Sequence, residues 1–422
     1  MIVKFTENYI IGEKLSFLIS NFLRVRKKTS ELVSKLEPED MIVQSNDFVS
    51  PIKWHLGHTT WFFENFILLK KKNYKRFDKS FNYIFNSYYN GIGKYNPKEK
   101  RGTINRPLLD HVIKYRKYID KNITDLLNKK NLTSKIKFLI KLGINHEQQH
   151  QELILMDVLN NFFNNPLKPK YLKPKKDKRK SHKQILWKNT TATLFNYGVD
   201  DSSFHYDNES PLNSIKINPF ELNINFVSNN EWLEFIDNDG YNRPELWLSD
   251  GWDFIKKNDI KKPLYWLDNN LKFSFFGVEK IDGSQPVSNI SFYEAYAYSR
   301  FKKKRLPTEF EIEYFLTQNK KNGNFLENGN FKEITINKKN ANENSYGNLW
   351  CWTSSNYIPY SGYKSFSEKL SEYNQKFMCN QFVLKGGSYA TPKNHIRPTY
   401  RNFYYPSDRW QFSGLRLASD LK

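Results

Sequence analysis

The sequence predicts two domains, an N-terminal all-α four-helix bundle followed by a C-terminal domain that is α+β or mostly irregular. The chain has 422 residues, more than one ordinary core accommodates. Apolar side chains recur at helical spacing in the first part, whereas short aromatic and β-branched runs alternate with Asn, Gly, Asp and Pro further along. We therefore place the bundle at residues 1–165, a linker at 166–184 and the second domain at 185–422.

Four segments of the first domain are expected to be helical. They are Glu13 to Leu36, Ser50 to Lys71, Leu108 to Leu127, and Thr133 or Ser134 to Phe163. In the second segment, Ser50 is the expected N-cap and Pro51 suits the first helical position. Helices of this length pack as an antiparallel bundle. The Lys- and Pro-rich stretch that follows them indicates a solvated linker.

The formal charge of +22 does not by itself indicate a nucleic-acid partner. The lysines accompany abundant Asn, Ile, Phe and Tyr, as an AT-rich coding sequence produces, and apart from Lys168 to Lys183 they are scattered. No nucleic-acid-binding module is recognisable. We therefore expect no nucleic-acid partner.

Cysteine content and hydropathy indicate the compartment. The two cysteines, Cys351 and Cys379, exclude a disulfide framework and a Cys-rich zinc site. The N-terminus has no apolar core of signal-peptide length, and no stretch approaches the roughly 18 apolar residues of a membrane helix. We expect a cytoplasmic protein without a membrane partner. The sequence does not indicate the oligomeric state.

The clearest chemical signal is the segment NHEQQHQELILMDVL. Its His146 and His150 are four positions apart and share one face of the expected helix with apolar side chains, so both imidazoles should point into the bundle. Two neutral imidazoles in an apolar interior suit a metal ion. A hydrogen-bonded structural pair would give the same pattern. The segment also reads HExxH with Glu147, the pattern of zinc proteases, which remains an alternative.

A third ligand is expected from the second helix, which offers His55 and His58. Both lie near its apolar side, and His58 follows Trp54 by one turn. The residues alone leave both candidates open. The remaining histidines have no partner at ligand spacing and are expected to be structural or exposed: His111, His182, His205 and His395.

The whole chain resembles a known family. SPIKWHLGHTTWFFENFIL and NHEQQHQELILMDVL resemble the DinB-like helical domain of the ergothioneine-biosynthetic sulfoxide synthases (EgtB type). The blocks NEWLEFIDNDGYNRPELWLSDGW, PVSNISFYEAYAYSRFKKKRLPTEFEIE, GNLWCWTSSNY, LKGGSYATPKNHIRPTYRN and WQFSGLRLA resemble the formylglycine-generating-enzyme domain, a variant of the C-type-lectin fold. The blocks follow in the same order over nearly the whole chain.

The resemblance implies a reaction and a metal. It implies O2-dependent joining of a cysteine-type thiol, either cysteine or γ-glutamylcysteine, to imidazole C2 of hercynine (N-α-trimethylhistidine), with oxidation to the sulfoxide. It implies iron(II) held by His58, His146 and His150, which removes His55 from the ligand set. Three protein ligands on one face of the ion leave positions open for thiolate and O2.

The same resemblance implies further roles near the iron. Gln149 matches a residue that contacts the substrate imidazole, and Tyr88 and Tyr89 match a tyrosine pair able to deliver a proton. Arg101 and Arg106 are candidates for binding the carboxylate of the thiol substrate.

In the second domain, Asn402 and Phe403 align with the loop that lines the trimethylhistidine pocket, where aromatic faces suit a quaternary ammonium. The stretch GGSYATPKNHIRPTYRN lacks the cysteines that formylglycine-generating enzymes use, so that activity is not expected. Cys351 stands where the family usually has glutamate. Two alternatives stay open: a sister synthase that takes histidine or a selenium donor, and a non-catalytic lectin-like binding module.

Overall fold

The structure is a computed structural model, and it describes residues 15–129, 132–173, 186–200, 203–335, 345–366 and 370–421. The chain forms two compact units. The first comprises Met1–Tyr171 together with Asp200–Phe204 and Ser367–Tyr373, and the second comprises the remainder. Most of the expected linker, from residue 174 to 184, lies outside the described residues.

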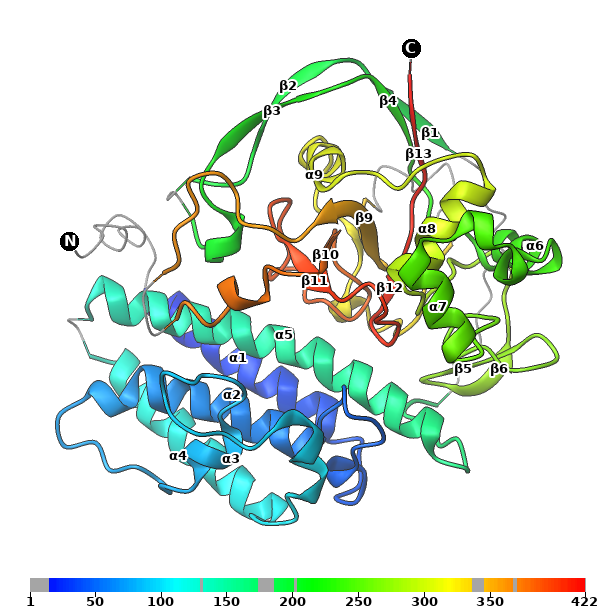
Figure 1. The fold of residues 1–422 in the computed structure, drawn as a ribbon. Coiled ribbons are helices and arrows are strands. Elements are labelled where there is room, and N and C mark those ends of the chain that lie inside the picture. Colours follow the sequence, from blue (N-terminus) through cyan, green and yellow to red (C-terminus); the bar gives the residue numbers. More distant parts are fainter. Residues whose placement is uncertain are drawn as a thin grey trace. The chain divides into compact units, whose positions relative to one another are not determined.

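The first unit is the expected helical bundle (Figure 1). Its long helices are α1 (Leu15–Val33), α2 (Ile52–Phe66), α4 (Leu109–Leu127) and α5 (Ser134–Asn164), joined by the short α3 (Phe81–Phe85) and the 3₁₀ turns Asp40–Ile42, Leu68–Lys70 and Lys98–Thr103. Helix α2 packs against α4 and α5, and α1 packs against α5. The four predicted helices are therefore confirmed.

The start of α2 differs from the prediction. Helix α2 begins at Ile52, and Pro51 takes the N-cap position without a side-chain cap. Ser50 does not cap the helix, and its hydroxyl oxygen instead accepts a hydrogen bond from Arg101 at 2.9 Å. The helix also ends early, at Phe66, and a separate 3₁₀ turn follows.

Helix α2 occupies the centre of the bundle, where every one of its residues except Asn65 is buried. Glycines allow the close packing around it. A Cβ atom at Gly57 would lie 2.1 Å from the ring of Phe85, and one at Gly143 of α5 would lie 2.5 Å from the ring of Phe63. Both glycines therefore give the neighbouring phenylalanines room beside the backbone.

The second unit is an α+β domain, as predicted. Its helices are α6 (Asn229–Asp237), α7 (Ser249–Lys257), α8 (Phe292–Phe301) and α9 (Glu309–Thr317). The largest sheet has the order β11-β10-β9-β12, formed by Asn402–Tyr404, Phe382–Lys385, Trp350–Asn356 and Ser413–Gly414. A three-stranded sheet has the order β1-β4-β13, formed by Trp187–Thr190, Phe220–Asn223 and Ala418–Asp420. Paired ribbons are formed by β2 and β3 (Thr193–Tyr197, Asn213–Ile217), β5 and β6 (Leu271–Ser274, Gly277–Lys280), and β7 and β8 (Gly323–Asn324, Tyr346–Gly347).

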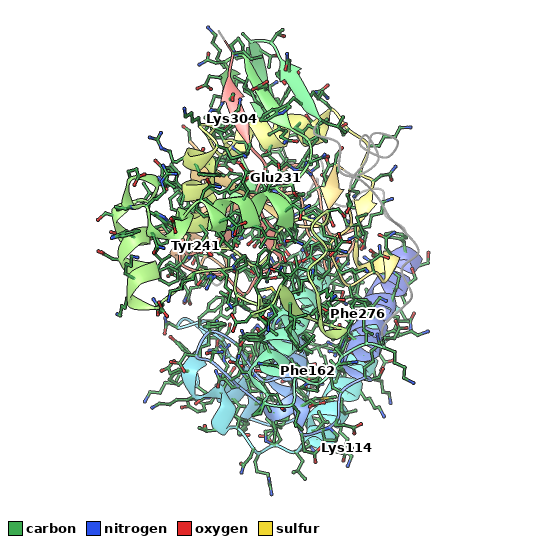
Figure 2. All side chains as sticks on the ribbon, turned by 90° about the vertical axis from the view of Figure 1, so that its right-hand side faces the viewer. Lys114, Phe162, Glu231, Tyr241, Phe276 and Lys304 are labelled. Atoms are coloured by element: carbon green, nitrogen blue, oxygen red, sulfur yellow. The ribbon has the colours of Figure 1, made fainter. Side chains whose placement is uncertain are left out.

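Three helices of this unit begin with the same capping box. In each, the side chain of the cap residue (Ser228, Ser291 or Thr308) accepts from the backbone N–H of the glutamate three residues on. That glutamate's carboxylate accepts from the backbone N–H of the cap residue. Glu231, labelled in Figure 2, is the glutamate that closes the box of α6. Among the helices that the structure describes, none combines the length and apolarity needed to cross a membrane.

Candidate metal centre

Three buried histidines from two helices of the first unit converge. His58 comes from α2, and His146 and His150 come from α5. One nitrogen of each imidazole lies within 4.8 Å of those of the other two. The closest pair, Nε2 of His58 and Nε2 of His146, is 3.2 Å apart. Two nitrogens bound at about 2.1 Å to one ion at a right angle lie about 3.0 Å apart, so the spacing suits two ligands of one metal.

Hydrogen bonds and ring stacking orient these nitrogens towards one another. Nδ1 of His58 lies 2.7 Å from the carbonyl oxygen of Phe85, which leaves Nε2 to face His146. The His58 ring stacks on Trp54 at 4.6 Å with 8° between planes. The Nδ1 atom of His146 is buried without a hydrogen-bond partner among the described residues. Two imidazole lone pairs that face each other are repulsive unless a proton or a cation lies between them, and a cation satisfies all three rings together.

The three imidazoles are neutral at physiological pH. Burial lowers the pKa of His146 to about 3, because the interior disfavours the charged form. Burial and the neighbouring His146 hold the pKa of His58 and that of His150 well below the usual range. A neutral imidazole has a lone pair to donate, so the set is in the form that a metal requires.

The structure groups His58, and not His55, with His146 and His150. His55 has both ring nitrogens engaged. Its Nδ1 lies 2.8 Å from Nδ1 of His150, and its Nε2 lies 2.9 Å from Oδ2 of Asp157. His55 therefore lies behind His150 and does not face the space between the three imidazoles.

Glu147 of the HExxH segment points away from the histidines into a buried charge cluster. It accepts hydrogen bonds from Arg26 and Thr29, each at 2.7 Å, and from Arg116. Burial alone would raise the pKa of Glu147, but the charges and hydrogen bonds of Arg116 and Arg26 outweigh it and hold the pKa at about 2. A carboxylate engaged in this way is unsuited to act as a general base, so the geometry argues against the zinc-protease alternative.

Tyr373 lies beside Gln149 and His146 and was not predicted from the sequence. The segment that ends at Tyr373 belongs to the helical unit. The Tyr373 hydroxyl donates to Oε1 of Gln149, and its ring centroid lies 5.8 Å from that of His146. The side chain is buried. Because 224 residues separate Tyr373 from Gln149 and its surroundings are irregular, no local pattern marks it.

The predicted tyrosine pair lies beside Tyr373. The rings of Tyr88 and Tyr89 stack with centroids 4.7 Å apart, and the Tyr88 hydroxyl lies 3.5 Å from the carbonyl oxygen of Tyr373. Tyr89 is buried and packs 5.7 Å from Trp61, whereas Tyr88 is half-buried. The structure thus brings Tyr88, Gln149 and Tyr373 together next to the histidines.

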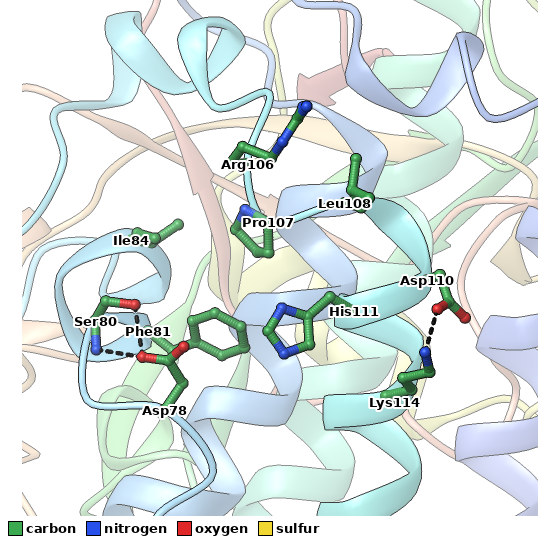
Figure 3. Close-up of a pocket in the computed structure, with 10 residues that line it drawn as sticks. All are labelled: Asp78, Ser80, Phe81, Ile84, Arg106, Pro107, Leu108, Asp110, His111 and Lys114. Atoms are coloured by element: carbon green, nitrogen blue, oxygen red, sulfur yellow. Dashed lines mark hydrogen bonds and ion pairs between the residues drawn. The ribbon is translucent and has the colours of Figure 1, made fainter.

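The two predicted arginines lie in different surroundings. Arg101 is buried, its guanidinium lies 3.4 Å from the centroid of the Trp54 ring, and burial lowers its pKa to about 9. Arg106 is exposed and lines a surface pocket of about 530 Å³ (Figure 3). That pocket is also lined by Phe81, His111 and Lys114, and neither Arg101 nor any of the three clustered histidines is among its lining residues.

The predicted substrate residues of the second unit lie on β11. Phe403 stacks on Tyr357 with centroids 4.1 Å apart and packs 5.9 Å from Phe377. Asn402 accepts a hydrogen bond from the backbone N–H of Phe403. Cys351 is buried, and burial raises the pKa of its thiol to about 11, whereas Cys379 is exposed. Neither thiol is paired with the other.

Comparison with known families supports the division into a helical part and an α+β part. Residues 21–154 match the DinB superfamily. Residues 173–346 and 343–421 match the sulfatase-modifying factor enzyme 1-like domain. The molecule is thus a DinB-like helical domain joined to an α+β domain of the formylglycine-generating-enzyme type. The chain belongs to the sulfatase-modifying factor enzyme 1-like family, and its combination of domains fits the ergothioneine-biosynthetic sulfoxide synthases.

Two relatives match about half of the chain. A hercynine oxygenase of Mycolicibacterium smegmatis is 31% identical over 242 residues, which cover 51% of this chain and 56% of that protein. A hercynine oxygenase of Mycobacterium tuberculosis is 30% identical over 253 residues, which cover 54% and 59%. The chain therefore spans little more than half the length of these relatives. Among solved structures, PvdO of Pseudomonas aeruginosa aligns with 58% of this chain over 100% of its own length, at 16% identity and a TM-score of 0.39.

Proposed function

We propose that the chain is an iron(II)- and O2-dependent sulfoxide synthase that joins a cysteine-type thiol to imidazole C2 of hercynine. The observation that carries the proposal is the buried set of His58, His146 and His150, neutral and convergent, in a chain similar to hercynine oxygenases. Iron is preferred to zinc because three imidazoles with open positions suit a metal that binds O2 and a thiolate together.

The overall balance defines what the protein must supply. A thiol, the C2–H imidazole and one O2 give the C–S-linked sulfoxide and one water. One oxygen atom ends on sulfur, and the other leaves as water with the hydrogens of S–H and C2–H. The bound iron would supply O2 activation and thiolate binding. The chain's own residues must hold the imidazole and carry a proton from carbon to oxygen.

Residues beside the histidines suit these tasks. The Gln149 amide is able to donate to or accept from an imidazole nitrogen and so orient the ring. The Tyr373 hydroxyl donates to Gln149, so the phenol lies beside the residue that would orient the imidazole whose C2 loses a proton. The Tyr88 hydroxyl lies near the backbone carbonyl of Tyr373, and the Tyr89 ring stacks on that of Tyr88, so both phenols belong to the same group. We assign proton transfer to this tyrosine group and orientation of the acceptor imidazole to Gln149.

Arg101 and the second unit complete the proposal. Arg101 is the stronger candidate for the thiol's carboxylate, because its buried Nε has no hydrogen-bond partner within the described ranges. The exposed Arg106 is the weaker candidate. We assign Asn402 and the aromatic face of Phe403 to the trimethylammonium group of hercynine.

Anaerobically purified protein is expected to bind about one iron(II) per chain and to consume O2 only when hercynine and a thiol are both present. Mass spectrometry identifies the product after separate incubations with cysteine, γ-glutamylcysteine or a selenium donor, each with hercynine or histidine. Product with hercynine and a thiol supports the proposal. A product only from histidine or only from the selenium donor would support the sister-synthase alternative. Iron binding without O2 uptake with any pair would favour the binding-module alternative.

Replacing Tyr373 with phenylalanine is expected to lower the yield of sulfoxide relative to simple thiol oxidation by about 100-fold or more, the usual contribution of a positioned proton donor. The ring and its packing on His146 are retained, so iron content should not change. Tyr88→Phe and Tyr89→Phe, tested separately, divide the role within the group. Tyr118→Phe is the matched control, because its hydroxyl bonds the backbone oxygen of Lys75 on an exposed side of α4. An unchanged product ratio in all three site variants would refute the proton-transfer role.

A further inference from the structure

A chain of hydrogen bonds runs behind His150, away from the other two histidines. Nδ1 of His150 lies 2.8 Å from Nδ1 of His55, and Nε2 of His55 lies 2.9 Å from Oδ2 of Asp157. The same carboxylate oxygen accepts the backbone N–H of Ser50 at 2.8 Å. All four residues are buried, so solvent does not compete for these bonds.

Hydrogen-bond chemistry assigns each proton in this chain. An ionised carboxylate only accepts, so Nε2 of His55 must carry the proton that it donates to Asp157. In a neutral His55, Nδ1 is then a bare acceptor. The facing Nδ1 of His150 must therefore be the N–H donor. This leaves Nε2 of His150 as the atom with a lone pair.

The Asp157 end of this series of hydrogen bonds is itself held in place by neighbouring residues. Ser50 lies just before α2, and Asp157 lies in the second half of α5. The Ser50 hydroxyl accepts a hydrogen bond from Arg101 at 2.9 Å. The Arg101 guanidinium lies over Trp54, whose ring stacks on His58. The hydrogen-bonded residues next to His150 are thus connected, through Arg101 and Trp54, to the candidate ligand His58.

The three histidines differ in how they are held. His58 is fixed by a backbone carbonyl, and Nδ1 of His146 has no partner in the part of the chain that the structure describes. Only His150 is backed by a second imidazole and a carboxylate. Such a partner fixes the tautomer and ring orientation of a ligating histidine and raises its basicity.

We propose that His55 and Asp157 form a positioning pair that holds His150 in the Nδ1–H tautomer and so presents its Nε2 to the metal. This inference rests on the proposed metal centre. It also gives His55, which occupies the helix position one turn before His58, a defined role as the group that orients a ligand.

The test compares cobalt(II) binding by the full chain and by two variants of His55. Cobalt(II) is the probe because its visible absorption reports the number and geometry of its ligands. His55→Leu removes both nitrogens at similar volume and is expected to weaken binding about 10- to 100-fold and to alter the spectrum. His55→Asn keeps an acceptor near the Nδ1 position and is expected to recover most of the affinity. His111→Leu removes an exposed imidazole and should bind as the unmodified chain does.

The outcomes separate the two proposals. If the unmodified chain does not bind cobalt(II), the metal centre itself is wrong. If it binds and His55→Leu has the same affinity and spectrum, the positioning pair is wrong while the metal centre stands. If His55→Asn is as weak as His55→Leu while both are folded, His55 acts through packing and the pair is again refuted.

A measurement without any variant covers the case in which His55→Leu does not fold. Histidine labelled with ¹⁵N in the unmodified, metal-free chain reports by NMR which ring nitrogen carries the proton. The expected result is Nδ1–H for His150 and Nε2–H for His55. The opposite tautomer at either residue would overturn the proposal.

Discussion

Replacing His146 with alanine is expected to abolish iron(II) binding by the full chain. His146 contributes the nitrogen closest to His58, and two remaining imidazoles make a poor site for a divalent ion in a buried, apolar setting. The loss of affinity should exceed the about 100-fold that follows when only a hydrogen-bond partner of a ligand is removed. Anaerobic titration with iron(II), followed by metal analysis after gel filtration, measures the effect.

The controls for His146→Ala distinguish loss of a ligand from loss of structure. Circular dichroism must show an unchanged helix content, and His150→Ala should behave in the same way because both residues belong to one cluster. His111→Ala, on the exposed side of α4, should retain iron. Full iron occupancy together with turnover in His146→Ala would rule out the ligand assignment.

Replacing Glu147 with glutamine is expected to lower the free energy of unfolding by about 3–5 kcal/mol, because it leaves Arg26 and Arg116 buried without their shared carboxylate. Iron affinity per folded chain should change little, since Glu147 points away from the histidines. Chemical denaturation of the metal-free protein, followed by circular dichroism, measures the change. Glu31→Gln is the matched control, because Glu31 is half-exposed on α1 and its ion pair with Lys28 is worth little.

The pH dependence of this contribution has a defined sign. The pKa of Glu147 in the folded chain is about 2, below its value of about 4.3 in an unfolded chain. A lowered pKa means that the stabilisation is present above about pH 4.3 and is lost as the pH falls towards 2. The stability difference between the unmodified chain and Glu147→Gln should therefore shrink over that interval. A constant difference, or an effect on iron binding at neutral pH as large as that of His146→Ala, would contradict the structural role.

The helical bundle was predictable because its apolar residues follow one period over long segments. Leu18, Phe22 and Val25 recur at three- and four-residue spacing in α1 and are buried. Helices α4 and α5 begin and end within a residue or two of the predicted bounds. The cap of α2 was not predictable, because the hydroxyl of Ser50 is taken by Arg101, a residue 51 positions further on. Local patterns do not contain such competing partners.

The candidate site was predictable only in part for the same reason. His146 and His150 share a helix face, and periodicity alone places them together. The choice between His55 and His58 depends on two residues that are distant in sequence. Asp157 binds His55, and the carbonyl oxygen of Phe85 orients His58. The position of Tyr373 could not be predicted, because it belongs to a segment of the helical unit that lies 224 residues after Gln149 in the sequence.

The position of Glu147 directly after His146 has a consequence for metal loading. One helix, α5, presents candidate ligands on one side and the carboxylate of a buried ion-pair cluster on the other. The cluster holds α5 against α1 and α4 without any contribution from an ion. The proposed metal ion is therefore not needed to assemble the bundle, in contrast to small zinc domains that fold only when loaded.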